Sequence, residues 1–142
     1  MRTTQLARTW FQEVWNNKNV SAINELSDPE TFCLAESGEL SCPDDFRRRV
    51  FEPMISALPD IQLTVDGTVS EDDQVVVRWT AVATHSGALG DIEPSGRRVK
   101  FSGMTWLKIE EDKITSASDS YNLNGLLTFL ATGEESATVR SA

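Results

Sequence analysis

The chain contains few of the residues that carry metal or nucleophilic chemistry. Its 142 residues include one histidine and two cysteines, and Cys33 and Cys42 do not form a CxxC motif. Because a structural zinc site takes four ligands, usually as closely spaced pairs, we predict no metal site. The two cysteines are expected to be free thiols, with a disulfide as the alternative. The sequence also lacks a glycine-rich phosphate loop and a serine nucleophile elbow.

Long apolar runs and an excess of basic charge are also absent. No apolar segment reaches the ~20 residues that a membrane-spanning helix needs, and the N-terminus lacks the apolar core of a secretory signal. The 22 acidic and 13 basic side chains give a net charge of −9, which disfavours nucleic acids and anionic membranes as partners. These absences predict a cytoplasmic protein that binds neither nucleic acid nor a membrane.

Apolar residues recur with helical spacing in the first part of the chain and alternate in the second. Helical spacing predicts helices over residues 4–17, 20–26 and 41–58. Pro53 should kink or interrupt the last of them. Alternation predicts strands over residues 31–34, 61–65, 74–84, 97–109 and 113–122. A short closing helix is expected over residues 124–131.

Helices followed by a run of strands are typical of an α+β fold. We expect a cone-shaped, curved antiparallel sheet with the three N-terminal helices over one face. Such a shape encloses an apolar pocket suited to a small apolar ligand or substrate. The hydrophobic and charged contents, 39% and 25%, fit a single domain, which we assign to residues 1–131. The polar residues 132–142 predict a flexible C-terminal tail.

The most informative residue is Asp119, in the predicted last strand. Ser118 and Ser120 take the opposite face of that strand, whereas Ala117 and Tyr121 share the face of Asp119. If the serine face meets water, Asp119 points inward, where a carboxylate must be paired, protonated or used in chemistry. Two interpretations stay open: a general base with a raised pKa, or a carboxylate bonded to an arginine or a backbone amide without chemistry.

Three further polar residues also have two interpretations each. His85 ends the second long strand on its apolar side, where it is a candidate acid or hydrogen-bond donor at the pocket rim, or an ordinary strand-end residue. The hydroxyl of Tyr121 could hold a developing enolate, or the ring could simply form part of the wall. Asn122 could orient a substrate carbonyl or a water, or it could cap the closing helix.

Large apolar side chains fall on both faces of the predicted strands and helices. Most belong to the core, and four are predicted to line the pocket: Trp10, Met54, Trp79 and Phe101. Trp106 and Met104 take the opposite face of the sheet, beside Arg78 and Lys100. Because an aromatic among cations on the back of a sheet often marks a dimer interface, we expect a homodimer that pairs through the sheet.

Several segments, in this order and spacing, resemble one known family. They include the helical start at residues 10–23, the Leu58-Pro59-Asp60 end of the long helix, the Thr84-His85-Ser86-Gly87 corner, the Ser95-Gly96-Arg97 return and the Leu123-Asn124-Gly125 closing helix. Together they are similar to the SnoaL-like polyketide cyclases, also called ester cyclases, of the nuclear transport factor 2-like superfamily. The resemblance covers nearly the whole chain and implies the curved α+β fold described above.

The resemblance also implies an activity. Members of the family close a ring by an intramolecular aldol reaction without a cofactor, and Asp119 falls where many of them place an acid. Members usually carry tryptophan and aspartate at the positions of Ser118 and Asn122, and the best-known cyclases use a histidine that residues 103–106 lack. The resemblance further implies that two copies pair through the sheet.

Three functions stay open at this point. The first is a cofactor-independent cyclase or isomerase that moves a proton on an apolar, carbonyl-containing substrate of polyketide type. The second is an epoxide hydrolase in which Asp119 activates water, a reaction that normally needs an arginine and a second acid nearby. The third is a binding protein without catalysis, which the replacements at Ser118 and Asn122 favour.

Overall fold

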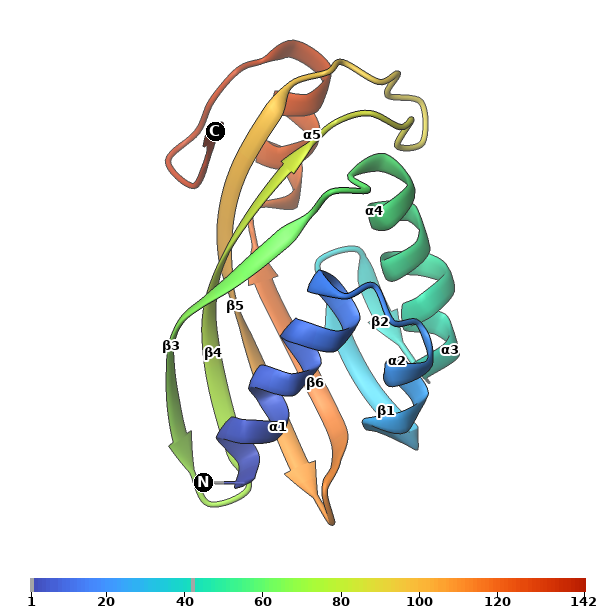
Figure 1. The fold of residues 1–142 in the computed structure, drawn as a ribbon, viewed down its shortest axis with the longest axis vertical. Helices are drawn as coiled ribbons and strands as arrows, with labels where there is room; N and C mark the ends of the chain where they lie inside the picture. Colours follow the sequence, from blue (N-terminus) through green and yellow to red (C-terminus); the bar gives the residue numbers. More distant parts are fainter. Residues whose placement is uncertain (1, 42) are drawn as a thin grey trace.

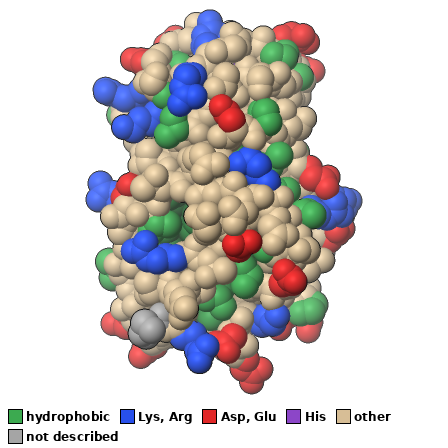
Figure 2. Space-filling model, in the orientation of Figure 1, with side chains coloured by type: hydrophobic (Ala, Val, Ile, Leu, Met, Phe, Trp, Pro, Cys, Tyr) green, Lys and Arg blue, Asp and Glu red, His purple; other side chains and the backbone are tan. Residues whose placement is uncertain are grey.

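The computed structural model describes residues 2–41 and 43–142, so Cys42, one of the two predicted thiols, lies outside the described residues. Two helical segments come first, a short pair of strands and a third helical segment follow, and the long strands of a curved sheet come after them, as the sequence predicts. The N-terminal helices lie across one face of that sheet (Figure 1). Acidic and basic side chains are interspersed over the surface on this side (Figure 2), as is usual for a face in contact with water.

Three helical segments form the layer over the sheet. They are α1 (Arg2–Trp10) with its π-helical extension η1 (Phe11–Asn16), then α2 (Ser21–Glu25), and finally the continuous run of α3 (Pro43–Phe46), η2 (Arg47–Phe51) and α4 (Glu52–Ala57). The interruption predicted at Pro53 is present, because the π-helical segment η2 ends two residues before it. Proline donates no hydrogen bond and crowds the carbonyl four residues earlier, which a wider turn relieves.

The sheet contains the strands β1 (Ser27–Ala35), β2 (Gly38–Leu40), β3 (Gln62–Glu71), β4 (Gln74–Thr84), β5 (Arg98–Glu110), β6 (Lys113–Tyr121) and β7 (Val139–Ser141). Their order is β2-β1-β6-β5-β4-β3, with β7 paired to β5. The β1–β6 pair is parallel and the other pairs are antiparallel. The long central strands β4, β5 and β6 carry the sheet side of the core.

A bulge in β6 sets the direction of its later side chains. Lys108 of β5 pairs with Ser116, but the next residue, Ile109, pairs with Ile114, so Thr115 is an extra residue in β6. The bulge lets Ile114 and Asp119 face the same side, which strict alternation would forbid. Ile114 is an odd number of residues before Asp119, and the bulge is the reason that both side chains still face the helices.

Polar side chains at the end of η1 and just after it attach the helical layer to the edge strand β3. The amide of Asn16 donates to the Leu63 carbonyl at 2.9 Å and accepts from the Leu63 N–H at 2.7 Å. The ammonium of Lys18 donates to the Ile61 carbonyl at 2.7 Å. These bonds occupy backbone groups that an edge strand would otherwise leave open, and they hold η1 close to the sheet.

The C-terminal segment differs from the prediction. Residues 132–142 were expected to be a flexible tail, yet Val139–Ser141 form β7 against β5, and Val139 is buried. The helix α5 (Leu123–Thr132) ends at Gly133, whose left-handed φ of 81° turns the chain back toward the sheet. The prediction missed β7 because one buried valine among polar residues produces no periodic pattern.

The face of the sheet that points away from the helices keeps large apolar side chains exposed. Trp106 is 54% exposed and Met104 is 52% exposed. Their cross-strand neighbours include Val76 and Arg78 of β4, so this face combines apolar and cationic side chains. The predicted homodimer stays a prediction. No helix among residues 2–41 and 43–142 is long and apolar enough to cross a membrane.

If two copies pair through this face, Trp106→Lys should convert a dimer into a monomer. The substitution places an additional cation beside Arg78, and like charges across an interface oppose association. Light scattering coupled to size-exclusion chromatography measures the mass of both proteins. Val20→Lys, at an exposed apolar site on the helical side, is the control and should not change the mass. A wild-type protein that is monomeric at every concentration would contradict the prediction.

Candidate active site

A cavity lies between the helical layer and the sheet. The space in and in front of it, open solvent at the mouth included, is about 900 Å³, and its lining is mostly apolar. Aromatic rings form much of the wall: Trp10, Trp15, Phe46, Trp79, Phe101 and Tyr121. Met54 also lines the cavity. The structure thus brings together five of the residues that the sequence assigned to the pocket: Trp10, Met54, Trp79, Phe101 and Tyr121.

The helical side of the wall is a cluster of rings from two segments that are distant in sequence. Phe46 of α3 lies 5.4 Å from Trp10 and 6.0 Å from Trp15, measured between ring centroids. Edge-to-face and tilted ring pairs at these distances are favourable. The cluster joins α1 and η1 to α3, so the cavity wall also holds the helices together.

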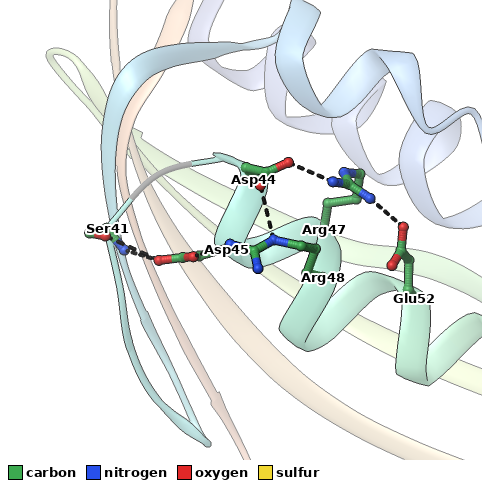
Figure 3. Close-up of polar contacts among 6 residues, drawn as sticks. All are labelled: Ser41, Asp44, Asp45, Arg47, Arg48 and Glu52. Carbon is green, nitrogen blue, oxygen red and sulfur yellow. Dashed lines mark hydrogen bonds and ion pairs between the residues drawn. The ribbon is translucent and has the colours of Figure 1, made fainter.

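Salt bridges on the outer side of the continuous helical run connect α3, which carries Phe46, to η2 and α4. Figure 3 shows Arg47 between Asp44 and Glu52, and Arg48 near Asp44 and Asp45. The hydrogen bond from Arg47 lowers the pKa of Asp44. Exposed ion pairs contribute little individually. Their arrangement keeps charge on the solvent side of the helix and leaves its apolar side to the cavity.

The sheet side of the wall depends on a glycine. Trp79, Phe101 and Tyr121 pack with centroid distances of 5.8–6.0 Å. Gly103 lies between them in the sheet: a Cβ there would come within 2.7 Å of the Trp79 ring and of the Tyr121 Cβ. Only a residue without a side chain leaves room for the indole to lie across the strand.

Asp119 lies on this wall beside Thr105, its partner in the β5–β6 register. The Thr105 hydroxyl donates to Asp119 Oδ1 at 2.7 Å, and the Trp79 indole N–H donates to the same hydroxyl at 3.0 Å. Asp119 is partly buried and lines the cavity. The inward direction predicted from the serine alternation is therefore what the structure shows.

The electrostatic surroundings of Asp119 favour its neutral form. Burial raises the pKa of Asp119 to about 6, and the negative charge of Glu36 adds to this shift, while the hydrogen bond from Thr105 opposes it. Glu36 lies in the turn between β1 and β2 and accepts the Tyr121 backbone N–H at 2.8 Å. Burial raises the pKa of Tyr121, and the negative charges of Asp119 and Glu36 raise it further. The Tyr121 hydroxyl therefore keeps its proton and can act as a hydrogen-bond donor.

His85 and Asn122 lie elsewhere. His85 is fully buried at the end of β4 and is not among the residues that line the cavity. Its Nδ1 is 2.8 Å from the Ser95 hydroxyl and accepts the Ser95 N–H at 3.1 Å, and burial lowers its pKa. Asn122 is the N-cap of α5 and accepts the Gly125 N–H at 2.9 Å. These positions favour the second interpretation of Asn122 and remove His85 from the pocket rim.

Sequence reasoning missed two residues beside Asp119. Thr105 has a visible signal, because it is a lone hydroxyl on a strand face that otherwise carries apolar residues and glycine. Glu36 has none, since it reaches β6 from a turn more than 80 residues away. Among residues 2–41 and 43–142, no group of three or more potential ligands gathers closely enough to hold a metal ion.

The fold and the cavity define a small α+β protein with a carboxylate on an aromatic wall. The chain belongs to the SnoaL-like polyketide cyclase family, whose sequence profile matches residues 5–130. The family resemblance seen in the sequence is thereby confirmed. Curated proteins give no match.

Solved structures of similar proteins share this architecture. AclR, a proposed hydroxylase from Streptomyces galilaeus, is 29% identical with a TM-score of 0.78, over 90% of this chain and 80% of that chain. A proposed SnoaL-like polyketide cyclase from Jannaschia sp. CCS1 is 15% identical with a TM-score of 0.83, over 92% of each chain. A proposed polyketide cyclase from Acidithiobacillus ferrooxidans is 21% identical with a TM-score of 0.76, over 92% of this chain and 94% of that chain. The predicted α+β fold is confirmed.

Asp119→Asn should stabilise the fold at neutral pH. The pKa of Asp119 rises from 3.8 to about 6 on folding, so the folded protein holds this proton more tightly than the unfolded chain does. The free energy of unfolding therefore decreases as the pH rises from about 4 to 6. Above pH 6 that loss amounts to as much as about 3 kcal/mol, at about 1.4 kcal/mol per pKa unit. An amide does not ionise, so the difference in unfolding free energy between variant and wild type, measured in urea, should grow from pH 4 to pH 7. Asp91→Asn, at an exposed loop position, should show no such growth.

Gly103→Ala should destabilise the protein and disturb the aromatic wall. Its new methyl group would meet the Trp79 ring and the backbone of β6, and overpacking of this kind typically costs about 1–3 kcal/mol. Urea unfolding gives the loss of stability and tryptophan fluorescence reports the wall. Gly67→Ala is the matched control, because nothing lies within 4 Å of a Cβ at that strand position. Equal stability of the two variants would contradict the prediction.

Proposed function

We propose that this chain is a cofactor-independent enzyme of the cyclase or isomerase type, which transfers a proton on an apolar, carbonyl-containing substrate. The observation that carries the proposal is the Asp119 carboxyl, with a pKa of about 6, on the aromatic wall of a mostly apolar cavity. A general base is most effective when its pKa lies near the working pH. At neutral pH most of the Asp119 population is ionised and still basic enough to accept a proton.

The proposed reaction starts at a carbon next to a carbonyl group. The Asp119 carboxylate takes a proton from that carbon, and the electron pair moves to the carbonyl oxygen to give an enolate. The Tyr121 hydroxyl, which keeps its proton, is placed on the same wall to donate a hydrogen bond to the enolate oxygen. The enolate carbon then attacks a second carbonyl of the same molecule. The proton held by Asp119 neutralises the new alkoxide, so the step balances without an oxidant or a reductant.

The aromatic walls support this assignment through positioning. Trp10 and Phe46 from the helices oppose Trp79 and Phe101 from the sheet across the cavity. A slot lined with rings binds a flat apolar molecule and limits the conformations in which its reacting carbons meet. It also excludes water that would otherwise solvate the carboxylate.

The position of Arg78 makes epoxide hydrolysis the weaker alternative. That reaction normally needs an arginine that faces Asp119. Arg78 is exposed and pairs with Met104 in the β4–β5 register, on the outer face of the sheet. No arginine or lysine is among the described residues that line the cavity.

Asp119→Asn separates catalysis from simple binding. The variant should lower kcat by about 10²–10⁴-fold, the range expected for loss of a general base, while the Kd for an unreactive aromatic ketone stays within about twofold because the wall is unchanged. Turnover of a panel of polycarbonyl compounds is followed by ultraviolet absorbance, and binding is followed by tryptophan fluorescence. Asp91→Asn controls for the change of net charge. Undiminished turnover in Asp119→Asn would overturn the proposal.

A further inference from the structure

We propose that Thr105 is a positioning residue, which holds the Asp119 carboxylate so that Oδ2 faces the substrate, and that Trp79 fixes the direction of the Thr105 hydroxyl. This inference rests on the proposed function, because it concerns the oxygen with which Asp119 takes the proton. It gives a role to Thr105 and Trp79, which take no part in the reaction steps proposed above.

The sequence of donors and acceptors determines the direction of each hydrogen bond. An indole N–H is a donor only, so Trp79 Nε1, 3.0 Å from the Thr105 hydroxyl, must donate to it. A hydroxyl has one proton, and with Trp79 as its donor Thr105 is left to give that proton to Asp119 Oδ1, 2.7 Å away. The chain of bonds therefore runs in one direction, from Trp79 to Asp119.

The two oxygens of Asp119 are consequently not equivalent. The Thr105 hydroxyl donates to Oδ1, and among residues 2–41 and 43–142 the hydrogen bond to the Asp119 carboxylate is made at Oδ1 and not at Oδ2. Because Asp119 lines the cavity, Oδ2 is the oxygen left for a ligand. A proton taken from the substrate then resides on Oδ2, where it is also placed for return to the substrate.

The position of Thr105 makes the hydrogen bond rigid. Thr105 is 5% exposed and Trp79 is 5% exposed, so water does not compete effectively for either group. Thr105 and Asp119 are direct partners in the β5–β6 register, and Trp79 is held by its ring contacts to Phe101 and Tyr121. The last torsion of an aspartate side chain is otherwise broad, and a base performs best when its geometry is fixed before the substrate arrives.

The bond also has an electrostatic consequence that a purely structural threonine would not have. A hydrogen bond donated to a carboxylate favours its ionised form and lowers the pKa of Asp119. Removal of the Thr105 hydroxyl should therefore raise that pKa further, although the shape of the wall is nearly unchanged. A structural role alone would alter stability and leave both the pKa and kcat in place.

The test compares Thr105→Val and Thr105→Ser with the wild type. Valine keeps the shape of threonine without its hydroxyl, so Thr105→Val should raise the pKa of Asp119 by about one unit and lower kcat about tenfold or more, with KM within about threefold. Thr105→Ser keeps the donor and should restore both values. The pKa is read from a carbon-13 NMR titration of the Asp119 carboxyl, assigned with Asp119→Asn. If Thr105→Val does not fold, Thr105→Ala takes its place in the same comparison.

Two controls make the result specific. Thr80→Val removes a threonine hydroxyl that bonds Asp66 at 2.6 Å elsewhere in the sheet, and it should leave the pKa of Asp119 unchanged. Trp79→Phe removes the donor to Thr105, and it should raise the pKa of Asp119 by less than Thr105→Val does, because the bond from Thr105 remains.

The outcomes distinguish this inference from the proposed function. If Asp119→Asn abolishes turnover but Thr105→Val changes neither the pKa of Asp119 nor kcat, the positioning role is overturned and the proposed function stands. If the pKa shifts as expected but Asp119→Asn remains active, the hydrogen bonds are as described and the proposed function fails. A rise in pKa with a fall in kcat, both reversed in Thr105→Ser, supports the inference.

Discussion

The properties of the cavity depend on the Asp119 carboxylate, which the surrounding side chains keep away from bulk water. Burial favours the neutral form of Asp119, and the charge of Glu36 acts in the same direction. The hydrogen bond from Thr105 opposes both effects. The result is a pKa of about 6, so the carboxylate remains ionised in a neutral solution while it keeps the basicity of a partly desolvated group. The aromatic wall thus sets the chemistry of Asp119 as well as the shape of the cavity.

The backbone of the sheet makes this arrangement possible. The extra residue Thr115 changes the parity of β6, so that Ile114 and Asp119 both face the helices. Gly103 leaves the space in which the Trp79 ring lies, and that ring donates to Thr105. A bulge in β6, a glycine in β5 and an indole N–H from β4 therefore act on the same carboxylate from three neighbouring strands. All three features belong to strands of the sheet, whose backbone is more rigid than that of a loop and so holds the carboxylate in a fixed position.

Much of the fold and part of the site could be predicted from the sequence. Alternating serines placed Asp119 on the inner face of β6, and apolar spacing placed Trp79 and Phe101 beside it, because side-chain direction follows directly from strand geometry. His85 also lies on an apolar strand face by parity, yet its ring packs against Ser95 beyond the cavity. Parity tells which side of a sheet a residue takes, but it does not tell how far along that side the cavity extends.

The sequence by itself determined the local elements, their order, the family and the inward direction of Asp119, since each of these follows from covalent geometry and from short-range patterns of apolar residues. The tertiary structure decided which groups surround that carboxylate. Glu36 reaches it from a distant turn, and Thr105 meets it only through the β5–β6 register. It also decided the place of Val139, buried in β7. The physical reason is that electrostatic and hydrogen-bond energies depend on distances through space, which chain closure sets and no local pattern contains.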